Sequence, residues 1–156
     1  NIQALNDGAP GAIQEFFKWA RQIKEEDLPG ISYTTLGPGE IGTYAPGLLS
    51  KGSISLNFYI REASPEARAA VLAHELYHYW DKRVARNYYS NVSYGFIDPA
   101  TKHQHEYDAY FVTGLFWQSA KTDQTAQSPL GEFLDKLPTE RDKVREMVNE
   151  YAGKKR

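Results

Sequence analysis

His74, Glu75 and His78 form an HExxH arrangement, in which the two histidines are four positions apart. On a helix this spacing places both imidazoles on one face, so that they can bind one metal ion with Glu75 beside them. Zinc with two histidines and a third protein ligand keeps a position for water, which it acidifies toward neutral pH, and Glu75 can serve as general base. The pattern therefore predicts one zinc ion per chain and hydrolytic chemistry. The competing interpretation is two ordinary histidines at an accidental spacing.

The third zinc ligand is expected from a separate element further along the chain. Glu106 follows His78 by 106 − 78 = 28 positions and begins a second predicted helix, which can fold back antiparallel to the first. Ala109, one turn later, is small enough to let the two helices approach. Glu106 is therefore the first candidate. The alternative ligands, in order of preference, are His105 and then His103 or Asp108.

Other polar residues are candidates for supporting roles. A metal-bound imidazole usually donates its outer nitrogen to a carboxylate or carbonyl, and the candidate carboxylates are Asp81 and Asp108. Asp81 follows His78 by three positions, although it could equally face solvent beside Lys82 or Arg83. The oxyanion formed during amide hydrolysis needs a donor besides zinc. Candidates for that donor are Tyr94, Tyr110, His103 and His105.

The chain resembles the gluzincins, and in particular the HExxH proteins of the ImmA/IrrE type. The resemblance rests on HExxH and on Glu106-Tyr107-Asp108-Ala109, which is similar to the E-x-[DE]-A pattern that carries the glutamate ligand in those proteins. It covers residues 53–115 and implies a zincin-like fold, zinc and peptide-bond hydrolysis. Tyr110 departs from it, because such families tend to have Asp or Asn there. A metzincin is excluded, because Asp81 and Val84 stand where that class has Gly and His.

The elements that must position these residues can be read from the hydrophobic pattern. Ser64-Pro65-Glu66 is a strong helix start, and the helix that carries HExxH is expected over 65–83. Strand 53–60 precedes it, with Ile54, Leu56, Phe58 and Ile60 expected on its buried face. Further helices are expected at 12–24, 103–120, 128–137 and 139–151, and a long loop at 87–102 with a short strand at 92–96.

These elements predict an α+β fold. We expect a small, twisted, mainly antiparallel sheet of three to five strands, built mainly from 31–60 and packed against the active-site helix and the glutamate helix. Strand 53–60 is the expected docking edge for a peptide substrate, although it could also be a plain sheet strand. With 156 residues, the chain suits one domain spanning 1–156.

Composition limits the classes of partner. The net charge of −2 and the pI near 6.1 offer no basic surface for nucleic acid or an anionic membrane. No apolar run reaches the length that crosses a bilayer. Cysteine is absent, which excludes disulfides and thiolate zinc ligands. We expect a soluble monomer, and the start at Asn1 rather than Met favours removal of an earlier segment and export.

Together these observations predict a zinc metallopeptidase acting on peptide or protein substrates. One alternative is a regulatory protease of narrow specificity, which would cleave a single protein partner. Another is a zinc-binding interaction module that keeps HExxH without turnover. A DNA-associated protease is disfavoured by the absence of a basic face.

Overall fold

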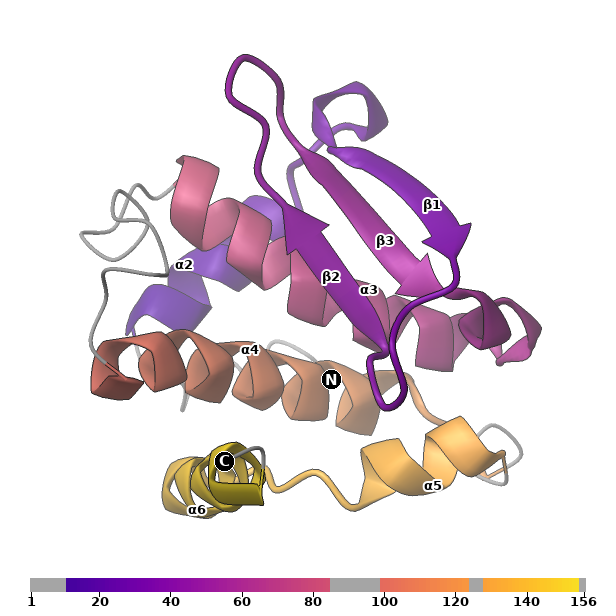
Figure 1. Ribbon diagram of the computed structural model, residues 1–156, viewed down its shortest axis with the longest axis vertical. Coiled ribbons are helices and arrows are strands. Elements are labelled where there is room, and N and C mark those ends of the chain that lie inside the picture. The colour runs from indigo at the N-terminus through magenta and orange to yellow at the C-terminus, as the bar shows by residue number, and fades with distance from the viewer. Residues whose placement is uncertain (1–10, 85–98, 124–127, 155–156) are drawn as a thin grey trace.

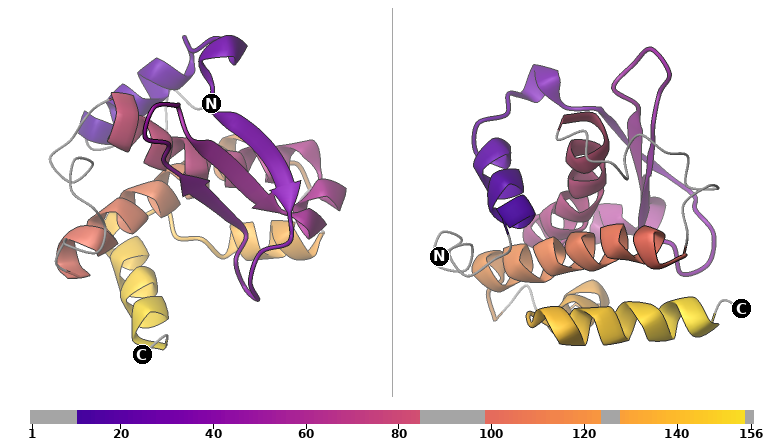
Figure 2. Two further views of the ribbon diagram at one scale, coloured as in Figure 1. Left: turned by 45° about the horizontal axis from the view of Figure 1, so that its top comes forward. Right: turned by 90° about the vertical axis from the view of Figure 1, so that its left-hand side faces the viewer.

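The computed structural model describes residues 11–84, 99–123 and 128–154, with the backbone alone for 99–105, 141 and 151–154. A three-stranded sheet covers one side of helix α3 (Pro65–Tyr79), and helix α2 (Gly11–Ala20) lies on the other side (Figures 1 and 2). Helix α4 (Pro99–Ala120) packs against α3 and against α6 (Arg141–Lys154). The predicted α+β class is confirmed at this level.

The sheet is mixed rather than mainly antiparallel. Its strands are β1 (Gly30–Thr34), β2 (Gly42–Ala45) and β3 (Ser53–Asn57), in the order β1-β3-β2. β3 pairs with β2 antiparallel, as the short connection between them favours, but it pairs with β1 in parallel. The central strand is therefore β3, and β2 is an edge strand among the described residues.

The strand predicted at 53–60 ends early. After Asn57 the chain turns into the 3-10 helix η2 (Phe58–Glu62), which takes the side chains out of the two-residue alternation. Ile54, Leu56 and Ile60 are buried as expected, but Phe58 is 54% exposed, so its predicted burial is wrong.

Helix α3 has the start that its sequence predicts. The Ser64 hydroxyl accepts a hydrogen bond from the Ala67 amide, and Pro65 occupies the first turn, where its missing N–H costs nothing. The α-helix ends at Tyr79 and continues as a π-helical turn, Trp80–Val84, so the predicted span of 65–83 is nearly right. Because α3 lies between the sheet and two other helices, it buries residues on several faces.

The other helices differ from prediction mainly at their ends. α2 stops before the predicted end at 24, and the segment after it forms a short 3-10 helix, Glu25–Asp27. α4 begins at Pro99 instead of 103, since proline is well suited to a first helical turn. α5 (Pro129–Asp135) is capped by Ser128, and α6 starts two residues later than predicted. The strand predicted at 92–96 lies outside the described residues. In the described part, no helix combines the length and apolar character needed to cross a bilayer.

Candidate metal centre

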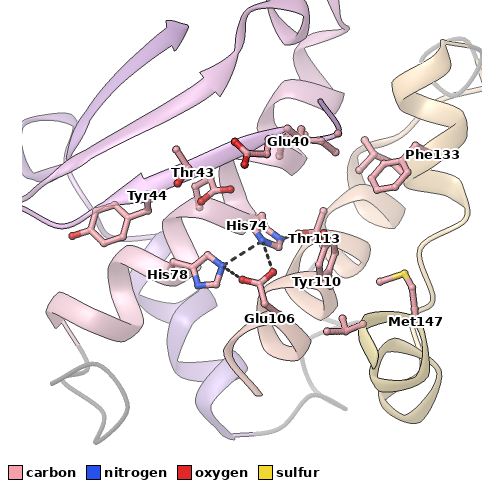
Figure 3. Close-up of a pocket in the computed structure, with 17 residues that line it drawn as sticks. Glu40, Thr43, Tyr44, His74, His78, Glu106, Tyr110, Thr113, Phe133 and Met147 are labelled. Atoms are coloured by element: carbon pink, nitrogen blue, oxygen red, sulfur yellow. Dashed lines mark hydrogen bonds and ion pairs between the residues drawn. The ribbon is translucent and has the colours of Figure 1, made fainter. Parts of the chain in front are cut away.

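His74, His78 and Glu106 converge on one point between α3 and α4 (Figure 3). Nε2 of His78 lies 2.9 Å from Oε1 of Glu106, and Nε2 of His74 lies 3.6 Å from Oε2. The two Nε2 atoms are 3.3 Å apart. The three donor atoms all lie within 4.8 Å of one another, so the group could hold a metal ion.

The approach of α3 and α4 brings these side chains together. Ala109 is completely buried and belongs to the same core cluster as Ala73 and Tyr77 of α3, at the place where the two helices pack together. The Tyr77 hydroxyl donates a hydrogen bond to Oδ2 of Asp108 at 3.1 Å and so ties the two helices together. Glu106 thereby faces the histidine pair across the helix interface.

The carboxylate and the imidazoles change each other's proton affinity. Burial lowers the pKa of His78, but the charge of Glu106 and its hydrogen bond outweigh this effect and raise the pKa to about 9. Burial raises the pKa of Glu106, whereas the charge of His78 and its hydrogen bond to the carboxylate hold that pKa well below its ordinary range. Without a bound cation, His78 and Glu106 therefore form an ion pair at neutral pH.

A cavity of about 600 Å³ opens at this group, and Glu75 lines it together with the three converging residues. Glu75 is 5% exposed, and its charge is close enough to raise the pKa of His78 further. Strand β2 and the segment before it form one wall, and α5 and α6 contribute Phe133 and Met147 at the other end (Figure 3). A carboxylate thus lies beside a candidate metal group in a space large enough for part of a peptide.

The structure places some of the other candidates and not others. Tyr110 lines the cavity, with its ring centroid 4.6 Å from that of His74 in an edge-to-face arrangement. Tyr94 lies outside the described residues, and the side chains of His103 and His105 lie outside them as well.

Neither Asp81 nor Asp108 accepts a hydrogen bond from His74 or His78 among the contacts of the described residues. Nδ1 of His78 is buried and has no hydrogen-bond partner among the described residues, so Asp81 does not make the predicted bond to it. Asp81 is 3% exposed, and its charge raises the pKa of His78. Asp108 accepts from Tyr77 instead. The i, i+3 spacing places Asp81 near His78 but does not aim its carboxylate at the ring.

Three features of the site were not predicted from sequence. Oγ1 of Thr113 lies 3.2 Å from Nδ1 of His74, and its position seven after Glu106 on a helical face is the signal that could have identified it. A Cβ added at Gly42 would lie 3.0 Å from Oε1 of Glu75. The strand beside the cavity is β2, whereas β3, the predicted docking edge, is paired on both sides. The prediction of a docking edge at 53–60 is therefore wrong.

Comparison of the chain with models of known protein families, with curated proteins and with solved structures found no match.

Proposed function

We propose that this protein is a zinc-dependent metallopeptidase in which His74, His78 and Glu106 bind the metal and Glu75 is the general base. One observation carries the proposal: two imidazole nitrogens and a carboxylate converge in the wall of a cavity that Glu75 also lines. The HExxH spacing alone would allow two unrelated histidines. The approach of a carboxylate from a second helix favours a metal site.

The donor set suits zinc. Ligands about 2.0 to 2.1 Å from a tetrahedral zinc ion lie roughly 3.3 to 3.4 Å from one another. The separations of 3.3 Å, 2.9 Å and 3.6 Å in this group scatter around that value. Imidazole and carboxylate are ordinary zinc ligands, and three protein ligands leave a coordination position open, as in catalytic zinc sites. The proposed ion needs no further protein ligand.

Glu75 moves the proton in the proposed hydrolysis. Zinc, when bound, supplies a Lewis acid that lowers the pKa of water toward neutrality. Glu75 accepts a proton from the attacking water on its carboxylate as the water oxygen bonds to the scissile carbonyl carbon. Glu75 then gives that proton to the amide nitrogen as the C–N bond breaks. The burial of Glu75 beside the candidate ligands supports this role.

Tyr110 is the proposed donor to the oxyanion. Of the candidates for this role, it is the one whose side chain the structure describes, and it lines the cavity against His74. A hydrogen-bond donor directed at the developing negative charge stabilises the transition state.

The proposed peptide substrate pairs with β2. Gly42, Thr43 and Tyr44 of this strand line the cavity, and β2 pairs with β3 along one side, which leaves its other side open in the described part of the chain. An extended peptide could add there as a strand, using backbone hydrogen bonds for affinity.

The proposal is tested by metal analysis combined with digestion of a peptide library at neutral pH. The protein should contain one zinc ion per chain, cleave peptides, lose activity on removal of zinc by a chelator and regain it on zinc addition. His74→Ala and His78→Ala should each lose zinc under chelator competition, since a site deprived of one of three ligands binds much more weakly.

Two other outcomes would change the assignment. Stoichiometric zinc without cleavage of any library peptide would instead support a zinc-binding interaction module. Cleavage of a single protein partner, with no cleavage of library peptides, would support a regulatory protease. Full zinc retention by either alanine variant would show that the proposed ligands are wrong.

A further inference from the structure

Thr113 makes two hydrogen-bond contacts in the interior of the protein. It belongs to α4 and is 3% exposed. Its hydroxyl Oγ1 donates to the carbonyl oxygen of Ala109 at 2.8 Å, one turn earlier in the same helix. The same Oγ1 lies 3.2 Å from Nδ1 of His74 on α3.

The direction of the second contact follows from the first. A threonine hydroxyl has one hydrogen and two lone pairs. Because that hydrogen points to Ala109, Oγ1 can only accept from His74, so Nδ1 of His74 must carry a hydrogen. In a neutral imidazole the other nitrogen, Nε2, then has a free lone pair, and Nε2 is the atom that faces His78 and Glu106.

We propose that Thr113 is a positioning residue that fixes His74 in the tautomer with hydrogen on Nδ1 and so directs the Nε2 lone pair to the metal. This inference rests on the proposed zinc site, and it assigns to a threonine hydroxyl the orienting role that a carboxylate often has in such sites. A hydroxyl that already donates elsewhere selects the tautomer without adding a negative charge to the site.

The arrangement of α4 and the contact between the two histidines support the inference. Thr113 follows Glu106 by 113 − 106 = 7 positions, which is close to two helical turns, so one face of α4 supplies both a metal ligand and the group that orients another. Nε2 of His78 directs its hydrogen to Glu106 at 2.9 Å and lies 3.3 Å from Nε2 of His74, so a lone pair on Nε2 of His74 avoids placing two N–H groups against each other. Nδ1 of His78 has no such partner among the described residues, so this support is specific to His74.

The first test compares zinc affinity in three variants by competition with a chelator. Thr113→Val keeps the shape of the side chain but removes the acceptor, and it should weaken zinc binding by roughly 10- to 100-fold. Thr113→Ser keeps the hydroxyl and should stay within about threefold of the wild type, because the same contact can form. Ser119→Ala is the matched control, since the Ser119 hydroxyl donates to the carbonyl of Phe116 in the same helix. Its zinc affinity should be unchanged.

The second test needs no substitution. Nitrogen chemical shifts of the His74 ring, measured in the wild-type protein after zinc removal and with the ring neutral, should show hydrogen on Nδ1. Hydrogen on Nε2 would overturn the inference, as would wild-type zinc affinity in a folded Thr113→Val variant. Neither readout requires peptide cleavage. A protein that binds zinc with the expected Thr113 dependence but cleaves nothing would contradict the proposed function and leave this inference standing.

Discussion

Nε2 of His78 lies 2.9 Å from Oε1 of Glu106, although the two residues are 106 − 78 = 28 positions apart. In the proposed site this carboxylate is a zinc ligand, so Glu106→Gln should weaken zinc binding strongly, by roughly 10-fold or more, because a neutral amide replaces a charged donor. His105→Ala, the neighbouring control, should keep most of the affinity. Chelator competition measures the zinc affinity of both variants. A larger loss of affinity in His105→Ala than in Glu106→Gln would assign the third ligand to His105.

The same ion pair makes the stability of the zinc-depleted protein depend on pH. Against the effect of burial, the surrounding carboxylates, Glu106 above all, raise the pKa of His78 from its ordinary 6.5 to about 9. Protonated His78 therefore contributes its full stabilisation of the folded state below pH 6.5, and this stabilisation is lost as pH rises through 9. The pKa of Glu106 is depressed in the folded protein, so ionised Glu106 also stabilises the folded state. This stabilisation is fully present above the ordinary pKa of 4.5 and is lost as pH falls through the lower pKa of the folded state.

The free energy of unfolding, measured with denaturant in the presence of a chelator, should therefore differ most between wild type and Glu106→Gln near pH 6. The difference should shrink toward pH 9.5. With zinc bound, the trend should reverse over the same range, because protons compete with the metal for the imidazoles. A difference that does not change between pH 6 and 9.5 in zinc-depleted protein would contradict the ion pair.

Glu75→Gln separates chemistry from metal binding. The glutamine keeps the size and hydrogen-bonding capacity of the side chain but cannot accept the proton, so turnover should fall by roughly 10²- to 10⁴-fold, or more, while zinc content and folding persist. Parallel zinc analysis and peptide cleavage provide the measurement. Glu140→Gln, at a carboxylate that is 70% exposed, serves as the control. Undiminished cleavage by Glu75→Gln would rule out the proposed base.

Gly42 sets the space available to that base. A Cβ at this position would lie 3.0 Å from Oε1 of Glu75 and 3.2 Å from its Cγ, so Gly42→Ala should displace the carboxylate by a few tenths of an ångström. We expect kcat to fall by roughly 3- to 30-fold with zinc content unchanged, since small misplacements of catalytic groups are costly. Gly30→Ala in β1 is the control, because a Cβ there meets nothing within 4 Å. Equal effects of the two substitutions would show that Gly42 has no special relation to Glu75.

Tyr110→Phe tests the proposed oxyanion donor. The substitution keeps the ring that packs against His74 and removes the hydroxyl, so kcat should fall by roughly 10²-fold while zinc binding remains. Tyr107→Phe is the matched control in the same helix, where the hydroxyl donates to Asn149 on α6. Steady-state kinetics on one library-derived peptide compares them, and unchanged kcat in Tyr110→Phe would remove Tyr110 from the mechanism.

Local signals predicted the helix of the HExxH motif and the approach of Glu106. Ser64 and Pro65 mark the start of α3, and the i, i+4 spacing of the histidines needs only a helix to bring their rings together. Glu106 could be predicted because Ala109 nearby permits close packing of a second helix, which the structure shows.

Features that depend on pairing between distant segments of the chain could not be predicted from local sequence signals. The alternation of apolar residues identified Ile54 and Leu56 as buried but does not say which strands lie beside them. β1 pairs in parallel with β3, although β2 lies between them in the sequence. The sheet edge beside the cavity consequently belongs to β2. The spacing of Thr113 places it on the same helical face as Glu106 but does not identify its partner, because its contact with His74 forms only once α3 and α4 have packed.

The division of the proposed site between α3 and α4 also sets the order in which its parts are synthesised. The ribosome completes the HExxH helix before it adds Glu106 and Thr113, so the nascent chain passes through a stage in which the motif exists and its partners do not. Domains fold as units while they emerge, and the metal group closes only when the second helix docks. An unfinished chain that ends before Glu106 therefore lacks the third proposed ligand and the hydroxyl proposed to orient His74.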